Sequence, residues 1–180
     1  KLTQLGVDVD RATCVDNLRR ILDPATEHGF FVGIDMEDSP YTDVTLQIFE
    51  TLWGQGYHNI GVVLQSYLMR TEADVRRVNT FGARIRLVKG AYKEPKTVAY
   101  QNKSEVDAAY VRLMQLLLDE AHYPAIATHD PVKIDATKGY DFTIRFGEET
   151  DTLDGEGELV ATSDVLLTSG QVADVLGRFT

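Results

Sequence analysis

Residues 84–92, Arg84-Ile85-Arg86-Leu87-Val88-Lys89-Gly90-Ala91-Tyr92, join a short apolar strand to a terminal cation and a glycine turn. The same order of features recurs on both sides of this stretch. Other apolar runs that end in polar residues lie at residues 30–36, 60–65 and 124–128. Between the runs, residues 42–54 and 104–121 carry apolar side chains at helical spacing. Short buried strands that alternate with amphipathic helices are typical of βαβ units in a parallel sheet.

Two parallel architectures are open, a doubly wound sheet and a (β/α)8 barrel. The glycine fingerprint of a dinucleotide-binding sheet is absent, and so is a Walker loop. Polar residues recur instead where strands end, at Asp35, Gln65, Lys89 and His129, which is where barrel enzymes place their active sites. A complete barrel typically needs about 250 residues. The sequence therefore predicts an α/β fold of the TIM-barrel type that is truncated or shortened.

Composition narrows the class of protein. The chain has 180 residues, 43% of them hydrophobic, and no run of eighteen apolar residues, so we expect one globular domain without a transmembrane helix. A single cysteine, Cys14, excludes an intramolecular disulfide and a cysteine metal cage and favours a reducing compartment such as the cytoplasm. The four histidines lack metal-ligand spacing, so we expect no metal site. A net charge of −10 argues against nucleic-acid binding.

The charge divides the chain into two parts. Residues 1–138 carry 16 basic and 19 acidic side chains, whereas residues 139–180 carry 2 and 9. We therefore treat residues 1–138 as the barrel portion and residues 139–180 as an acidic, divergent tail. In the tail we expect strands near residues 140–146, 159–161 and 165–168 and a short helix from Ser169 to Phe179. Lys1 opens the sequence in what we expect to be a strand, which suggests that residues upstream of it are missing.

The strand ends carry residues suited to an electron-rich heterocycle. Arg86 and Lys89 supply positive charge, and the amide of Gln65 can donate to and accept from a ring edge. Asp35 can orient a cationic group, and Lys1 adds a further cation. Thr128-His129-Asp130 can bind sugar hydroxyls or a phosphate at a helix start. The alternative is that these polar residues only form a solvated rim at the strand ends and bind no ligand. A carbohydrate hydrolase that uses Asp35 and Glu37 is disfavoured because only one face of a strand would carry both.

Residues 1–138 resemble the catalytic barrel of proline dehydrogenase, a flavin enzyme that oxidises L-proline. The Arg86–Tyr92 segment is the most specific of the matching pieces, which occur in the family's order and spacing at successive strand ends. The pieces are Lys1–Gly6, Ile34–Glu37, Val63–Tyr67, Arg86–Tyr92 and Ala127–Asp130.

The resemblance implies a distorted barrel that binds FAD non-covalently across its C-terminal mouth. Arg86 would lie beside the flavin N5, Lys89 and the Gly90-Ala91-Tyr92 turn would contact the cofactor, and Gln65 would bond the ring edge. Thr128, His129 and Asp130 would hold the ribityl–pyrophosphate part. Lys1 would lie by the substrate, and Asp35 would hold the pocket and its arginines. Proline would become pyrroline-5-carboxylate, and the electrons would pass to a quinone, which implies contact with a membrane surface.

The tail departs from the family pattern. The family ends its barrel with a helix whose two adjacent arginines clamp the proline carboxylate, and residues 139–180 contain no such pair. The adjacent pairs Arg19-Arg20 and Arg76-Arg77 lie on other predicted helices. Three explanations stay open: a divergent closure of the barrel, foreign sequence joined near Lys138-Gly139, or unreliable residue identities. The alternative function is a non-catalytic fragment that binds flavin or assembles, because an incomplete barrel leaves two unpaired strand edges that favour a homo-oligomer.

Overall fold

The computed structural model describes residues 1–128 and 130–137, together with the backbone of four short strands, 142–144, 152–153, 159–160 and 165–167. The chain divides into two compact units, Lys1–Thr128 and His129–Thr180, and each is described by itself. The first unit contains the sheet that positions the predicted site residues.

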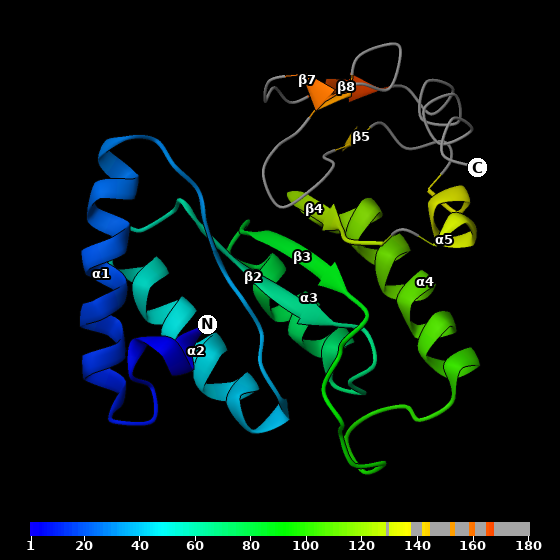
Figure 1. The fold of residues 1–180 in the computed structure, drawn as a ribbon, viewed down its shortest axis with the longest axis horizontal. Coiled ribbons are helices and arrows are strands. Elements are labelled where there is room, and N and C mark those ends of the chain that lie inside the picture. The colour runs from blue at the N-terminus through cyan, green and yellow to red at the C-terminus, as the bar shows by residue number, and fades with distance from the viewer. Residues whose placement is uncertain (129, 138–141, 145–151, 154–158, 161–164, 168–180) are drawn as a thin grey trace. The chain divides into compact units, whose positions relative to one another are not determined.

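The sheet of the first unit has four parallel strands in the order β1-β2-β3-β4 (Figure 1). The order never reverses, as it would at the switch point of a doubly wound sheet. A closed barrel has eight such strands, so the expectation of a truncated barrel is confirmed. The strands are β1 (Val32–Ile34), β2 (Ile60–Gln65), β3 (Arg84–Val88) and β4 (Tyr123–Ile126).

Helices connect these strands and cover one face of the sheet. Figure 1 shows α3 behind β2 and β3, and α4 also packs on β3 and β4. The first unit begins with a short 3-10 helix, η1, which is followed by α1. The helices are η1 (Leu2–Leu5), α1 (Arg11–Glu27), α2 (Ser39–Gly54), α3 (Thr71–Asn79) and α4 (Lys103–Glu120).

Side chains of β3 alternate between the two faces of the sheet. Ile85 and Leu87 are fully buried on the helix-covered side, whereas Arg86 is exposed on the other side. We call this second side the barrel face; Arg84, Arg86 and Val88 lie on it. The parallel register places Val63 beside Arg86 and Gln65 beside Val88, so β2 presents Gln65 on the same face.

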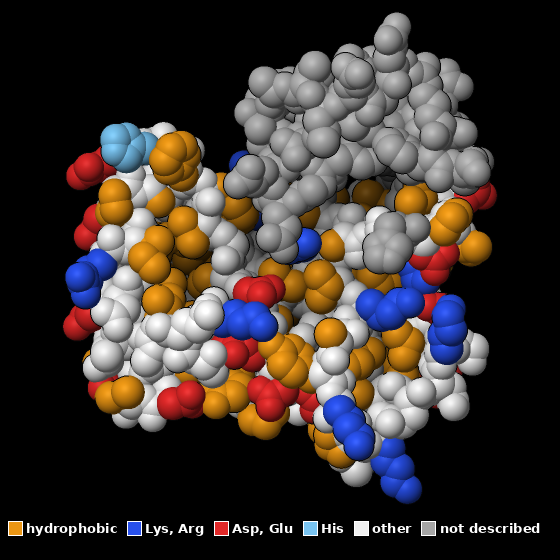
Figure 2. All heavy atoms as spheres, in the orientation of Figure 1, with side chains coloured by type: hydrophobic (Ala, Val, Ile, Leu, Met, Phe, Trp, Pro, Cys, Tyr) orange, Lys and Arg blue, Asp and Glu red, His pale blue; other side chains and the backbone are white. Residues whose placement is uncertain are grey.

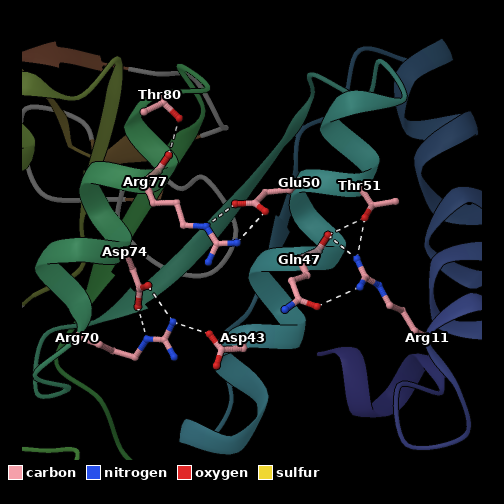
Figure 3. Close-up of polar contacts among 9 residues, drawn as sticks. All are labelled: Arg11, Asp43, Gln47, Glu50, Thr51, Arg70, Asp74, Arg77 and Thr80. Carbon is pink, nitrogen blue, oxygen red and sulfur yellow. Dashed lines mark hydrogen bonds and ion pairs between the residues drawn. The ribbon is translucent and has the colours of Figure 1, made fainter.

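Arginines connect the helices of the covering layer (Figure 3). Arg77 of α3 donates to both carboxylate oxygens of Glu50 on α2, at 2.5 and 2.7 Å. Arg70 joins Asp74 and Asp43 at 2.7 and 2.6 Å. Ion pairs at this exposure contribute about 0–1 kcal/mol each, so the buried apolar side chains beneath them supply most of the stability.

The Arg84 side chain stacks on two aromatic rings near the start of the strands. The guanidinium of Arg84 lies 4.4 Å from the ring centroid of Phe31 and 4.2 Å from that of Tyr123. Gly61 of β2 lies next to Arg84 in the register. A Cβ atom on Gly61 would clash with the carbonyl oxygen of Arg84 and with the ring of Phe31. The stack therefore requires glycine at this position.

Several predicted elements are confirmed and others are corrected. Residues 60–65 form a strand with the expected bounds, whereas the strand expected at 30–36 covers only residues 32–34. Lys1 does not lie in a strand; it precedes η1, where Thr3 donates to Glu37. Thr71 is followed by Glu72 and Asp74, which predicts that it caps a helix, but it is the first residue of α3 and its hydroxyl donates to the carbonyl of Gln65.

Ser104 and Asp107 have the spacing of a capping box, which predicts that a helix begins at Ser104, but this prediction is wrong. Helix α4 begins at Lys103 after Asn102, and Asp107 pairs with Lys103 and Lys89. The helix start at Asp130 is confirmed: its carboxylate accepts from the backbone N–H of Val132 at the beginning of α5 (Pro131–Asp135).

In the second unit, the short strands pair antiparallel. β5 (Phe142–Ile144) pairs with β8 (Val165–Leu167), and β6 (Thr152–Leu153) pairs with β7 (Leu159–Val160). The helix expected at residues 169–179 lies outside the described residues. Within the part of the chain that is described, no helix is long and apolar enough to span a membrane.

The Gly61→Ala variant tests the packing of the Arg84 stack. We expect it to lose about 1–3 kcal/mol of stability, because the added methyl group overpacks the strand contact. The matched variant Gly33→Ala in β1 should stay within about 1 kcal/mol of the unaltered chain, because nothing except the ring edge of Phe31 lies within 4 Å of its new methyl group. Urea unfolding followed by circular dichroism measures both. Equal losses in the two variants would contradict this account of the stack.

Candidate functional site

The structure brings Asp35, Gln65 and Arg86 to the barrel face. Asp35 directly follows β1 and is half-buried, Gln65 ends β2, and Arg86 is the middle residue of β3. Within the described residues, Asp35 makes no ion pair with Arg86, so its expected role in holding the arginines stays a prediction. The three side chains together offer a carboxylate, an amide and a cation along one edge.

The Gln65 amide is buried without a complete set of partners. The residue is 3% exposed, and its Oε1 atom accepts no hydrogen bond from any group that the structure describes. Its backbone is held in place, since its carbonyl accepts from the hydroxyl of Thr71 at 2.5 Å. A buried carbonyl without a donor costs about 1–3 kcal/mol. Gln65 is therefore suited to accept a hydrogen bond from a bound ligand.

The side chains of Arg86 and Lys89, which the sequence analysis assigns to the same site, point in different directions. Arg86 is exposed on the barrel face, whereas the Nζ atom of Lys89 lies 3.3 Å from a carboxylate oxygen of Asp107 on α4. The backbone of Lys89 continues the strand edge, because its carbonyl accepts from the N–H of Tyr67 at 3.1 Å. In this structure Arg86 alone of the two supplies charge to the barrel face.

The turn after β3 approaches Tyr67 closely. Gly90 has φ of 106°, in the region that favours glycine, and a Cβ atom there would lie less than 3 Å from the ring of Tyr67. Tyr67 is 7% exposed, and its burial raises the pKa of the phenol to about 12. Gly90 thus lets the start of this turn pass directly against a buried aromatic ring.

Lys1 is placed opposite this turn. Its Nζ atom donates to the hydroxyl of Tyr92 at 3.0 Å and lies 5.5 Å from the ring centroid. The bond to Tyr92 raises the pKa of Lys1, and the carboxylates of Asp35 and Glu37 act in the same direction. In Figure 2, acidic side chains border a basic one close to where Figure 1 marks the N-terminus.

The segment Thr128-His129-Asp130 is only partly described. Thr128 ends the first unit, His129 lies outside the described residues, and Asp130 belongs to the second unit. The carboxylate of Asp130 caps α5 and pairs with Lys133. The expectation that these three residues hold a phosphate or sugar stays a prediction.

Sequence reasoning considered Glu37 only as a partner of Asp35 in a hydrolase, and it missed Glu94. Both oxygens of Glu37 accept from Thr3, at 3.0 and 2.7 Å, which leaves no free carboxylate pair for such chemistry. Glu94 accepts from the N–H and hydroxyl of Ser39, both at 2.6 Å. These partners lie 34 and 55 positions apart, so no local pattern could indicate them.

Comparison with known proteins shows which proteins this chain resembles. The family model for proline dehydrogenase matches residues 1–138. Proline dehydrogenase 2 of Bacillus subtilis (strain 168) is 44% identical over 138 residues, which are 77% of this chain and 45% of that protein. The crystal structure of proline utilization A from Bdellovibrio bacteriovorus matches with a TM-score of 0.65 and 30% identity, over 72% of this chain and 16% of that one.

The chain spans less than half the length of the curated relative from Bacillus. A stretch of 49 residues, 27% of the chain, also matches a protein of another kind. It is 47% identical to tRNA pseudouridine synthase B of Ruegeria pomeroyi and covers 16% of that protein.

The pH dependence of stability tests the burial of Tyr67. Its pKa is near 10 in the unfolded chain and about 12 in the folded one, so the unfolded state loses its proton first as pH rises. The stability that this phenol contributes is full below pH 10 and is lost as pH approaches 12. In Tyr67→Phe we therefore expect the free energy of unfolding to fall less steeply above pH 10, by at most about 1.4 kcal/mol per pH unit.

Urea unfolding at a series of pH values measures this difference. The free-energy difference between the variant and the unaltered chain should stay constant between about pH 7 and 9, and above pH 10 it should change in favour of the variant. Parallel curves over the whole range would mean that Tyr67 ionises as an exposed phenol does.

Proposed function

Since the chain belongs to the proline dehydrogenase family, we propose that residues 1–138 hold FAD at the strand ends of the barrel face and oxidise L-proline. The observation that carries this proposal is the Gln65 amide, which is buried on the same face as Arg86 and has an acceptor atom without a described partner. An isoalloxazine ring carries donors and acceptors along one edge and gains negative charge when reduced. An amide and a guanidinium on one face of neighbouring strands fit both properties.

The turn after β3 fits the same cofactor. The backbone of Gly90 lies against the ring of Tyr67, so a flat ligand could lie against backbone rather than a side chain at this position. Lys89 pairs with Asp107 at 46% exposure, and this weak ion pair can exchange for a contact with the flavin. Thr128, His129 and Asp130 would hold the ribityl and pyrophosphate groups.

Lys1 and Asp35 would act on the substrate. The Lys1 ammonium would attract the proline carboxylate, and Asp35 would orient the ring nitrogen or a neighbouring cation. Proline would lose a hydride from its ring carbon and a proton from its nitrogen, and the C=N bond of pyrroline-5-carboxylate would form. Bound FAD supplies the two-electron acceptor for this oxidation. A quinone at a membrane surface would then take up the electrons.

A second candidate function is flavin binding without turnover, and residues 139–180 favour it. They contain no adjacent arginines to clamp the substrate carboxylate. Without that clamp, Lys1 would be the main anchor of the carboxylate, and affinity for proline would be low. In this case the chain would need a complementary piece, or a second copy of itself, to complete the substrate site.

We infer that the tail is foreign sequence joined to the barrel portion. The proline dehydrogenase match covers residues 1–138, so the 49 residues similar to tRNA pseudouridine synthase B fit best at the other end of the chain. A stretch of that length ending at Thr180 begins at Val132, inside α5 and close to the change in charge. The tail would then neither close the barrel nor replace the arginine clamp.

The proposed function is tested by titrating the FAD-loaded chain with L-proline without oxygen and following the flavin absorbance. Loss of the oxidised flavin band on addition of proline is the expected result. In Arg86→Gln we expect this reduction to slow at least about 100-fold, because the cation next to the ring is lost. Arg112→Gln on the exposed side of α4 is the matched control and should not alter the rate.

The outcomes separate the two candidates. A bound flavin that D-proline and L-proline both leave oxidised would favour the non-catalytic candidate. Reduction at equal rates in the Arg86 and Arg112 variants would contradict the role given to Arg86.

A further inference from the structure

Two glutamates fasten separate segments to the loop after β1. Glu37 binds Thr3 through both carboxylate oxygens, and Glu94 binds Ser39 in the same way. In each pair one oxygen accepts from a backbone N–H and the other from a hydroxyl. We name these pairs the Glu37 clasp and the Glu94 clasp.

The Glu37 clasp holds η1 in place. This 3-10 helix has four residues, and its N-cap residue Lys1 makes no capping bond with its side chain. A turn this short is unstable without support from outside. Glu37, which is 7% exposed, supplies the acceptor for the N–H of Thr3, while Leu2 is buried beneath it. The position of Lys1 therefore depends on Glu37.

The Glu94 clasp joins the β3–α4 loop to the first residue of α2. The N-cap residue of α2, Asp38, makes no capping bond, so Glu94 provides the acceptor for the free N–H of Ser39. Its negative charge is also favourable at a helix N-terminus. Tyr92 lies two residues before Glu94, so this clasp fixes the approach of Tyr92.

Both clasps end on the same short loop, because Glu37 and Ser39 are only two residues apart. This loop sets the distance between η1 and the β3–α4 loop, which are far apart in the sequence. Lys1 and Tyr92 meet as a result, at 3.0 Å between Nζ and the hydroxyl.

The clasps also affect the charge of the site. The carboxylates of Glu37 and Glu94 each accept two hydrogen bonds. Within residues 1–128 and 130–137, no carboxylate forms an ion pair with Lys1. The ammonium of Lys1 is therefore left for an anionic ligand rather than neutralised by Glu37.

We propose that Glu37 and Glu94 are positioning residues that hold Lys1 against Tyr92 and so set the point at which the substrate carboxylate binds. The last part of this statement rests on the proposed function. The first part concerns the chain alone and can be tested without cofactor or substrate.

The test compares Glu37→Gln and Glu94→Gln with Glu50→Gln in the whole chain. Glu50 is the matched control because its carboxylate also takes two bonds, from Arg77, but within the helical layer (Figure 3). Hydrogen exchange should speed up about tenfold at residues 2–5 in Glu37→Gln and at residues 39–41 and 90–94 in Glu94→Gln. Glu50→Gln should leave these segments unchanged.

A second readout reports the Lys1–Tyr92 contact itself. Titration of lysine side chains by NMR should find the raised pKa of Lys1 lowered toward its ordinary value in both clasp variants and kept in Glu50→Gln. Where a glutamate variant fails to fold, Thr3→Val and Ser39→Ala remove only the hydroxyl of each clasp and should change both readouts in the same direction. Clasp variants that match Glu50→Gln in both readouts would overturn the proposal.

The FAD-loaded chain then tests the link to substrate. We expect the KM for L-proline to rise about tenfold in the clasp variants, with kcat within about twofold of the unaltered chain. A fall in kcat without a change in KM would overturn the positioning role. If the unaltered chain does not oxidise proline, the proposed function fails, and hydrogen exchange and the Lys1 titration still decide whether the clasps position Lys1.

Discussion

The parallel register between β2 and β3 is the constraint on which the candidate site depends. It sets Val63 beside Arg86 and Gln65 beside Val88, and strand alternation then puts the amide and the guanidinium on the same face. A shift of one residue would bury Arg86 against α3 and α4 and expose Leu87. The apolar side chains Ile85 and Leu87, both fully buried, exclude that shift. The hydrophobic contact with the helices therefore decides where the functional groups point.

Much of this sheet could be predicted from short-range patterns. The apolar runs at residues 60–65 and 84–88 become strands with the same bounds, and the alternation in β3 predicts that Arg86 faces away from the helices. The direction of Lys89 could not be predicted, because its partner Asp107 lies on α4, 18 positions further along the chain. The clasps of Glu37 and Glu94 were missed for a related reason. Each joins segments that come together only when the sheet forms, and a lone glutamate in a loop usually faces solvent.

The first unit is thus half of a barrel whose strand ends already carry a defined set of groups. Gly61 and Gly90 each allow a close approach that a side chain would prevent, one at each end of the sheet. Helix contacts, rather than closure of a barrel, hold these strands, with ion pairs such as Arg77–Glu50 across the outer layer. The placement of Gln65 and Arg86 on the barrel face therefore does not depend on the residues that follow Lys138. Under the proposed function, the ends of these four strands would hold the flavin, whereas the substrate site would also need groups that they do not supply.

The central claim is that the described barrel face by itself provides a flavin site. Titration of FAD with the purified chain, followed through the quenching of flavin fluorescence, tests it most directly. The account predicts saturable binding of one FAD per chain, and weaker binding when Gln65 is replaced by leucine, which has similar size and no amide. FAD that remains unbound at every protein concentration, or that binds the Gln65→Leu chain equally well, would contradict it.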